Sequence, residues 1–482
     1  MSSSASKTKD SRPLKRVRLP RWASPSSLRR TRSAPHSSGP RPPCTWTLLS
    51  NLSVWCAVSI AVAWCVCFAA GTARATEVWL DVSKSAGKKI ALALPPLAAR
   101  ESAEETTLRQ TLESDLAITG FFRLLHLDGP LQALAENERG APQPDHAAWA
   151  AAGAELLLRV EAAHQDARLV LRATLVDVGG RSTLLAREES DAPAEAPRLA
   201  HRLSDAVVRA LTGKPGLALT RIATTWSNGA APKRVVIMDY DGRNQRPLSA
   251  DGVLALYPAW FPDGTRVAYV TYRQGRPEIV AQNVTTGQVR SLAFFPGLNA
   301  SPAISPDGKH LLLVLSRDGN PEVYRLAVDG SELKRLTFTP AVETSPVWSP
   351  DGTQIALVSD QGGGPQINLL GANGGRMRRV SFMGNYSTSP DWSPRGDRII
   401  FTALIENTFQ LVLLDPETGN QEQLTFDAEH KENPAFAPDG RHVVYSQGRG
   451  SSYRLVIIDT VTGERTRVSR EKGSFTSPAW SP

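Results

Sequence analysis

The stretch Ser345-Pro-Val-Trp-Ser-Pro-Asp-Gly352 decides the fold, because near-copies of it recur along the C-terminal half of the chain. The first proline of each copy falls at residue 258, 302, 346, 390, 434 or 478, a constant spacing of 44 residues. A period of about 40–45 residues is typical of one four-stranded propeller blade. The repeat therefore predicts an all-β propeller.

The interior of one repeat has the pattern of short strands joined by tight turns. After Asp351-Gly352 come the β-rich runs 353–359 and 366–370, a turn at Asn373-Gly374-Gly375, and a last run at 377–381. Asp-Gly and Asn-Gly pairs between apolar runs are strong hairpin signals, because primed turns need positive φ. With the leading strand that carries the motif, these runs make one four-stranded unit.

The final copy of the motif, Ser477–Pro482, supplies only a leading strand. Residues 220–249, ahead of the first full motif, supply only the other three strands. Pairing of the C-terminal strand with the run Arg221–Trp226 would complete this blade and leave no open sheet edge. We therefore predict a six-bladed propeller over residues 215–482, with five continuous blades and one split blade.

The first 75 residues have the composition of an export signal. Residues 1–46 are basic and rich in Ser and Pro, residues 48–70 are apolar and uncharged, and Ala73-Arg74-Ala75 has the small-x-small pattern of a cleavage site. We expect residues 1–75 to be a basic leader with a signal peptide cleaved at Ala73–Ala75. Retention of residues 48–70 as a membrane anchor is the alternative, since about 20 apolar residues can span a bilayer.

The formal net charge of +8 belongs to this leader. Residues 1–75 hold 12 of the 55 Lys and Arg residues and one of the 47 Asp and Glu residues, which leaves 43 basic and 46 acidic residues. The exported chain is therefore slightly acidic, and we do not expect it to bind nucleic acid. All four cysteines lie in the leader, so the remainder has no disulfide and no thiolate metal site.

Residues 76–214 predict a small α+β domain. A capping box at Ser102-x-x-Glu105 begins one helix, and an amphipathic helix carrying Leu199, Leu203, Val207 and Leu211 ends at Gly213. Strands are expected at residues 78–82, 90–94, 155–160, 168–178 and 182–188, and a short helix is expected from Asp145 to about Gly153.

Nothing in the sequence indicates catalysis. There is no G-x-S-x-G elbow and no H-E-x-x-H motif, and most histidines after residue 75 are expected at surface or helix-end positions. We expect no enzyme, no cofactor and no catalytic, cofactor-binding or metal-binding residue. The repeated residues are assigned to structure: Asp263, Asp307, Asp351 and Asp439 to turns, and Trp260, Trp348, Trp392 and Trp480 to packing between blades.

The loops that lead into the leading strands are the candidate binding surface. They are small and polar, they differ between blades, and they should gather round one mouth of the central channel. Polar loops on a rigid scaffold commonly carry function. The alternative is that their Ser and Thr residues only cap turns. The loops are residues 297–301, 341–345, 385–389, 430–433 and 473–477.

The ordered set of motifs resembles the TolB family, periplasmic propeller proteins of the Tol–Pal system of Gram-negative bacteria. The resemblance rests on Ala147-Ala148-Trp149-x₃-Gly153-Ala154-Glu155-Leu156, Leu211-Thr212-Gly213 and Thr220-Arg221-Ile222-Ala223. It rests also on Asp239-Tyr240-Asp241-Gly242-x-Asn244-Gln245 and on the ending Pro478–Pro482.

The resemblance implies a non-enzymatic periplasmic adaptor that supports outer-membrane integrity and constriction at cell division. It implies two partners, the lipoprotein Pal and the inner-membrane protein TolA, with other outer-membrane proteins as further candidates and membrane association only through partners. The implied TolA-binding segment is Thr76, Glu77, Val78, Trp79, Leu80, Asp81 and Val82. The implied Pal-binding positions are Leu298, Asn299, Ser301, Thr344, Ser345, Thr388, Ser389, Glu432, Asn433 and Thr476.

Two other functions stay open at this point. A periplasmic ligand- or glycan-binding propeller would need aromatic side chains exposed at the mouth, for which Tyr386 and Phe475 are the obvious candidates. A non-catalytic regulatory subunit would need a separate hydrolase chain as its partner.

Overall fold

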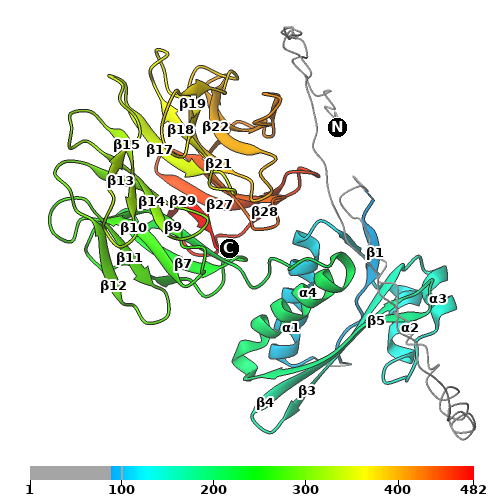
Figure 1. Ribbon diagram of the computed structural model, residues 1–482. Coiled ribbons are helices and arrows are strands. Elements are labelled where there is room, and N and C mark those ends of the chain that lie inside the picture. The colour runs from blue at the N-terminus through cyan, green and yellow to red at the C-terminus, as the bar shows by residue number, and fades with distance from the viewer. Residues whose placement is uncertain (1–87, 99–100) are drawn as a thin grey trace, which may run out of the picture. The chain divides into compact units, whose positions relative to one another are not determined.

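Residues 88–98 and 101–482 are described by the structure, a computed structural model, and they form two domains (Figure 1). The cleavage site at Ala73–Ala75 and the expected strand Val78–Val82 lie outside the described residues. Within the described part of the chain, no helix is both long enough and apolar enough to cross a membrane.

The N-terminal domain is built on a mixed five-stranded sheet of order β2-β1-β3-β4-β5. Strand β1 is parallel to both of its neighbours, β2 and β3, whereas β3, β4 and β5 form an antiparallel meander. The strands are β1 (Ile90–Ala93), β2 (Phe122–Leu124), β3 (Leu156–Gln165), β4 (Arg168–Asp177) and β5 (Ser182–Asp191).

Helices cover both faces of this sheet. On one face, α1 (Ala103–Ile118) and α4 (Ala196–Thr212) bury their leucine stripes against β3 and β4, and on the other face α2 (Gly129–Asn137) and α3 (His146–Ala151) cover Leu157 and Val176 (Figure 1). The short 3-10 turn η1 (Pro193–Glu195) precedes α4.

The predicted helix ends are confirmed. Ser102 Oγ accepts from the Glu105 backbone N–H at 3.1 Å, and Glu105 Oε2 accepts from the Ser102 N–H at 2.8 Å. These two bonds satisfy amide groups that a helix N-terminus otherwise leaves unpaired. Gly213 ends α4 in the left-handed conformation, with φ 70°. The sequence did not predict α2.

Two histidines, His201 and His442, depart from the surface or helix-end positions expected of most histidines, because both are buried. His201 Nδ1 lies 2.8 Å from Asp115 Oδ2 and so joins α4 to α1, and His442 Nδ1 lies 2.6 Å from Asp439 Oδ2. A buried polar side chain needs a hydrogen-bond partner, and each carboxylate supplies one. Both histidines therefore have structural roles.

The C-terminal domain is a six-bladed propeller of four-stranded antiparallel sheets, as predicted (Figure 1). Blade 1 contains β29 (Ser474–Trp480), β6 (Arg221–Ser227), β7 (Arg234–Asp239) and β8 (Arg246–Pro247). Blade 2 contains β9 (Ala255–Trp260), β10 (Arg266–Thr271), β11 (Glu278–Asn283) and β12 (Val289–Ala293). Blade 3 contains β13 (Asn299–Ile304), β14 (His310–Leu315), β15 (Glu322–Ala327) and β16 (Lys334–Arg335).

The remaining three blades follow the same order from the inner to the outer strand. Blade 4 contains β17 (Glu343–Trp348), β18 (Gln354–Ser359), β19 (Gln366–Gly371) and β20 (Arg378–Arg379). Blade 5 contains β21 (Ser387–Trp392), β22 (Ile399–Ile405), β23 (Thr408–Leu414) and β24 (Gln421–Gln423). Blade 6 contains β25 (His430–Phe436), β26 (His442–Arg449), β27 (Ser452–Asp459) and β28 (Arg465–Arg467).

The ring closes through the split blade. The C-terminal strand β29 pairs antiparallel with β6, with Phe475 opposite Trp226 and Trp480 opposite Ile222. A hydrophobic cluster then fills each interface between neighbouring blades, six in total within the described propeller. The propeller is therefore held by apolar packing that repeats round the ring.

The repeated tryptophans and aspartates have the structural roles expected of them. The Trp348 indole N–H donates to the Ala303 carbonyl of the preceding blade at 3.2 Å, and Trp260 donates to Ala479 at 3.1 Å. The carboxylate of Asp351 accepts from the Thr353 N–H at 3.0 Å and so stabilises its turn. Equivalent bonds are made by Asp263, Asp307 and Asp439.

Candidate functional site

The six leading strands share an irregular backbone conformation at one repeat position. In each of them, the residue before the repeated proline has a positive φ, between 49° and 54°. A side chain in this region costs about 1 kcal/mol or more, so a recurrence in all six blades indicates a geometry that the ring requires. The six residues are Tyr257, Ser301, Ser345, Ser389, Asn433 and Ser477.

Each of these residues begins a β-bulge. In blade 4, Thr344 pairs with Val358 and Val347 pairs with Ala356, so Ser345 and Pro346 together face the single residue Leu357. A bulge leaves backbone groups outside the ladder and re-aims the side chain. Proline has no N–H group, so it leaves no unpaired donor at this point. The bulges form a ring of polar positions, which we call the bulge ring.

Hydrogen bonds connect neighbouring members of this region. Asn433 Nδ2 donates to Ser389 Oγ at 3.0 Å, which joins the bulges of blades 6 and 5. Thr224 Oγ1 donates to the Thr476 carbonyl at 2.9 Å, just before the bulge of blade 1. The bulge ring is thus fixed by side chains as well as by the strands.

A second set of equivalent residues lies beneath the loops that lead into the leading strands. These residues are buried but mostly polar, and their side chains hold the loops from below. Asn299 Nδ2 donates to the Phe295 carbonyl at 2.7 Å, and Glu343 accepts from Thr339 Oγ1 at 2.7 Å. Ser387 Oγ donates to Gln366 Oε1 at 3.3 Å.

Lys431 occupies this position in blade 6, with no exposed side-chain surface. Its Nζ donates to the Asp427 and Glu429 carbonyls at 2.8 and 2.6 Å, and to the Asp427 carboxylate. Burial lowers the pKa of Lys431, while the Asp427 carboxylate opposes that shift. Burial likewise raises the pKa of Glu343. Charged groups therefore fix the loops of two blades.

The hairpins that end near these loops are longer in blades 5 and 6. The second and third strands have six residues each in blades 2, 3 and 4, seven in blade 5 and eight in blade 6. At about 3.3 Å per residue, the strands of the blade 6 hairpin stay regular for about 7 Å further than those of blades 2, 3 and 4. Tyr453 on this extension donates to Glu432 at 2.6 Å, so the extension is tied to the first residues of β25.

Exposed phenylalanines follow the outer strands of three adjacent blades. Phe338, Phe382 and Phe426 are 73%, 57% and 64% exposed and occupy one repeat position. Arg335 and Arg379 stack on the first two rings at 4.8 and 5.1 Å from the ring centroid. Aromatic and arginine side chains are enriched at protein interfaces.

The sequence singled out Tyr386 and Phe475 as exposed aromatic residues, and the structure separates them. Tyr386 is 39% exposed and packs edge-on against Phe409, whereas Phe475 is buried in the interface between blades 6 and 1. The exposed phenylalanines were not recognised from the sequence, although the recurring pattern of a Ser or Thr followed by Phe at residues 337–338, 381–382 and 425–426 was a signal.

Seven of the ten expected Pal-binding positions are of two kinds. Thr344, Thr388 and Thr476 are partly exposed and stand one residue before a bulge, and Ser301, Ser345, Ser389 and Asn433 are bulge residues. Glu432 is partly exposed, and Leu298 donates its N–H to Ser316 Oγ at 2.9 Å. Asn299 is fully buried and holds the loop that precedes β13 from below. The expected TolA-binding positions Thr76–Val82 lie outside the described residues.

One bulge is followed by an acidic residue. Asp391 occupies the place of Ala303, Val347 or Ala435 in other blades, and its Oδ2 accepts from the Phe436 backbone N–H at 2.7 Å. Burial raises the pKa of Asp391 to about 6, and the backbone N–H groups of Phe436 and Trp392 oppose the shift.

No group of three or more His, Cys, Asp or Glu side chains that could hold a metal occurs in residues 88–98 and 101–482. The arrangement therefore offers polar bulges, fixed loops and exposed aromatic side chains. These are features of a surface that binds a macromolecule.

Two family models match the chain in order. The model of the TolB amino-terminal domain matches residues 78–184, and the model of the TolB beta propeller domain matches residues 208–482. The second match covers more than half of the chain.

Individual relatives agree with these models. Two of them are named Tol-Pal system protein TolB. The protein of Nitrosococcus oceani is 31% identical over 259 residues, which are 52% of this chain and 58% of the relative. The protein of Paramagnetospirillum magneticum is 33% identical over 230 residues, which are 46% of this chain and 51% of the relative. The chain thus spans about half the length of these relatives. The crystal structure of TolB from Acinetobacter baumannii superposes with a TM-score of 0.72 at 29% identity, over 82% of this chain and 97% of that one.

Proposed function

The chain belongs to the TolB family, and from this premise we propose that it acts as a periplasmic adaptor of the Tol–Pal system that binds the lipoprotein Pal through the mouth of its propeller. The observation that carries the proposal is the bulge ring, which sets polar residues at one position of all six leading strands. The exposed phenylalanines that follow the outer strands of blades 3, 4 and 5 add apolar contact area to the surface.

The proposal includes a second partner and a route to the periplasm. The segment Thr76–Val82 alternates acidic and apolar residues, which suits an extended strand that adds to the sheet edge of TolA. The basic leader, the apolar run and the Ala73–Ala75 site support export with cleavage, and we propose domains at 1–75, 76–214 and 215–482 on this basis. The chain then supports envelope integrity and constriction as a binding protein and not as an enzyme.

Calorimetry with the periplasmic domain of Pal from the same organism tests the proposal. Thr344→Arg and Thr388→Arg each place a long charged side chain beside a bulge without changing the bulge residue itself. We expect each variant to weaken binding at least about tenfold, because an unpaired charge at an interface centre costs several kcal/mol. Val289→Arg, on the exposed outer strand of blade 2, is the control and should bind as the unchanged protein does.

The melting temperature of each variant separates loss of binding from loss of folding. Absence of Pal binding by a folded, unchanged protein would refute the proposal. Equal binding by all three variants would show that Pal binds outside the mouth. Deletion of residues 76–82 tests the TolA contact in the same way, and should leave Pal binding at the mouth intact.

A further inference from the structure

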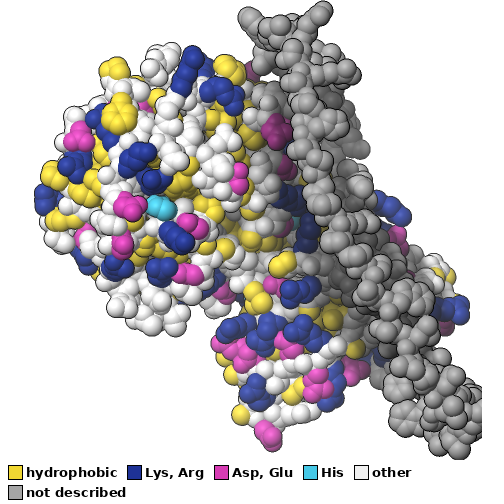
Figure 2. All heavy atoms as spheres, in the orientation of Figure 1, with side chains coloured by type: hydrophobic (Ala, Val, Ile, Leu, Met, Phe, Trp, Pro, Cys, Tyr) yellow, Lys and Arg dark blue, Asp and Glu magenta, His cyan; other side chains and the backbone are white. Residues whose placement is uncertain are grey.

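The outer edge of blade 4 carries arginine side chains that lack acidic partners. Elsewhere in the propeller, arginines at the surface are commonly paired with a carboxylate, as Arg335 is with Glu322 at 2.6 Å and Arg273 with Glu278 at 2.7 Å. Basic and acidic side chains are accordingly interspersed over the propeller surface seen in Figure 2. Residues 361–390 contain no Asp or Glu, although this stretch includes Arg376, Arg378 and Arg379.

The repeat shows which of these three arginines has a structural task. Arg379 Nε donates to the carbonyl two residues later, Ser381, at 2.7 Å, and the equivalent Arg335 and Arg467 make the same bond to Thr337 and Ser469. Arg379 therefore belongs to the ordinary construction of a blade. Arg376 and Arg378 are different: among the described residues, neither side chain has a hydrogen-bond or ion-pair partner.

The position of Arg378 is basic in the three preceding blades, where the side chain reaches the next blade. Arg246, Arg290 and Lys334 each donate to a backbone carbonyl in the turn between the third and fourth strands of that blade, at 2.8, 3.4 and 2.9 Å. Arg378 makes no such bond to a described residue of blade 5. Its guanidinium is exposed and free to bind a ligand.

Arg376 departs from the repeat as well, because the equivalent residues in blades 3, 5 and 6 are Glu332, Asn420 and Glu464. Further positive charge comes from blade 3, where Lys334 Nζ and Arg325 Nη1 bond to Asn373 at 2.9 and 2.8 Å. Asn373 lies three residues before Arg376. Positive charge from two blades is thus gathered round one turn.

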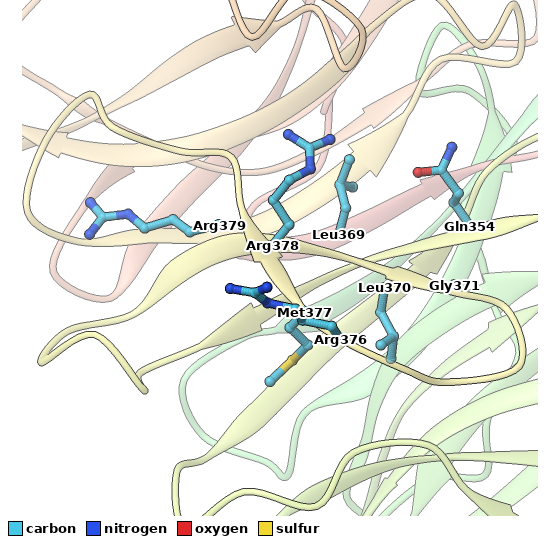
Figure 3. Close-up of a pocket in the computed structure, with 8 residues that line it drawn as sticks. All are labelled: Gln354, Leu369, Leu370, Gly371, Arg376, Met377, Arg378 and Arg379. Atoms are coloured by element: carbon cyan, nitrogen blue, oxygen red, sulfur yellow. The ribbon is translucent and has the colours of Figure 1, made fainter. Parts of the chain in front are cut away.

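A hollow of about 720 Å³ lies at this edge (Figure 3). Leu369, Leu370 and Met377 give it apolar walls, and the arginines with Gln354 give it a polar rim. Figure 3 shows the guanidinium groups of Arg376, Arg378 and Arg379 spread along the outer chain of the blade. The outermost strand, β20, pairs with β19 on one side and with no described residue on the other.

We propose that the outer edge of blade 4 binds an extended, acidic segment of a partner protein that adds to β20 as a further strand. The main chain of the segment bonds to the open edge, its carboxylates pair with Arg376 and Arg378, and an apolar side chain between them enters the hollow. The charge complementarity selects an acidic segment, and the strand edge selects an extended one. This surface lies on the outer strand of the blade and is separate from the bulge ring.

The test uses the full chain and a fluorescein-labelled peptide of alternating Glu and Val, nine residues long. Its affinity is measured by fluorescence anisotropy at physiological salt, and its place of binding by hydrogen–deuterium exchange. We expect slower exchange of the amides in residues 366–380. Arg376→Ser combined with Arg378→Ser should weaken binding at least about tenfold and remove this protection.

The control replaces Arg465 and Arg467 by Ser at the outer strand of blade 6, where Arg465 is already paired with Asp427. It should bind the peptide within twofold of the unchanged protein, and both double variants retain the basic residues of the leader. Any of three results overturns the proposal: the two double variants bind the peptide equally, residues 366–380 are not protected from exchange, or the unchanged protein does not bind the peptide. If inorganic pyrophosphate competes with the peptide but the peptide does not protect β20 from exchange, this edge is an anion site only, and the proposal is also overturned.

Discussion

Replacement of Asp391 by Asn should stabilise the propeller at alkaline pH and leave its stability at acidic pH unchanged. The carboxyl pKa is raised by burial to about 6, whereas an Asp in an unfolded chain titrates near 4. The folded protein therefore binds more protons than the unfolded chain between about pH 4 and pH 6. Its stability falls as the pH rises through this window, and the ionised carboxylate remains a cost above it.

The magnitude follows from the shift. About 2 pKa units correspond to about 3 kcal/mol, and the partial exposure of Asp391 lets solvent screen the charge, so that about 2 kcal/mol is a better expectation. Asn retains an oxygen that can accept from the Phe436 N–H, but it cannot ionise. For a domain of this size, 2 kcal/mol corresponds to about 4–8 °C in melting temperature.

The assay is the melting temperature of Asp391→Asn and of the unchanged protein at pH 4.5, 6 and 8, compared at each pH so that the other carboxyl groups cancel. The two proteins should differ least at pH 4.5, and the variant should melt higher at pH 8. A variant that is less stable at pH 8, or a difference that does not change with pH, would show that the carboxylate at this position is not destabilising. Asp391→Ala is a second control, because it removes the acceptor and should melt below Asp391→Asn by the equivalent of about 1–3 kcal/mol at every pH.

Three further predictions concern the ring and its mouth. Trp480→Ala should destabilise the propeller by about 3–5 kcal/mol in urea unfolding, because it empties the interface that closes the ring. Ser345→Val should cost about 1–2 kcal/mol, since a β-branched residue is strained at φ 50°, whereas Thr344→Val beside it should change stability by less than about 0.5 kcal/mol. Lys431→Met should cost about 2–3 kcal/mol and speed hydrogen exchange in residues 427–433, because it leaves buried carbonyl groups without a donor.

The closure of the ring could be predicted from the sequence because it follows from the number of copies of the motif. A strict spacing of the motif fixes the number of blades, and a final motif without its remaining strands must be completed by residues 220–249. The turn aspartates and the packing tryptophans were predictable for a related reason, since each side chain acts on its own turn or on the adjacent blade. A side chain that acts on nearby residues can therefore be recognised from the sequence of its own repeat.

The bulge ring could not be predicted. A residue that precedes proline is normally restricted to the β region, so the motif at Ser345-Pro346 reads as continuous strand. The left-handed conformation arises only when six leading strands converge, which no local pattern encodes. The burial of Asn299 escaped prediction as well: a polar residue in a polar loop gives no sign that its side chain points down into the blade.

The longer hairpins of blades 5 and 6 could not be predicted from the sequence, because the repeat has the same length in every blade. Residues 316–321 form a loop in blade 3, whereas the equivalent residues 448–453 belong mostly to strands β26 and β27 in blade 6. The number of residues is the same, so the spacing of the motif does not change. In blade 5, Glu406 and Asn407 both have positive φ and form the tight turn that lets the strands extend. A change from loop to strand therefore occurred without a change in length.

These departures from the repeat are where specific function should be sought. Outside the bulge ring, the positions that are alike in all six blades are determined by turns and by packing between blades, and each can be explained without a partner. Asp391 stands where other blades have Ala303, Val347 or Ala435, Lys431 stands where blades 3 and 5 have the neutral Asn299 and Ser387, and Arg376 stands where blades 3 and 6 have Glu332 and Glu464. A propeller built only for stability would gain from the repeat residue at these places. Their cost is therefore consistent with a binding task in blades 4 to 6, next to the extended hairpins, and the regular blades 1 to 3 serve as the rigid frame that holds this sector in place.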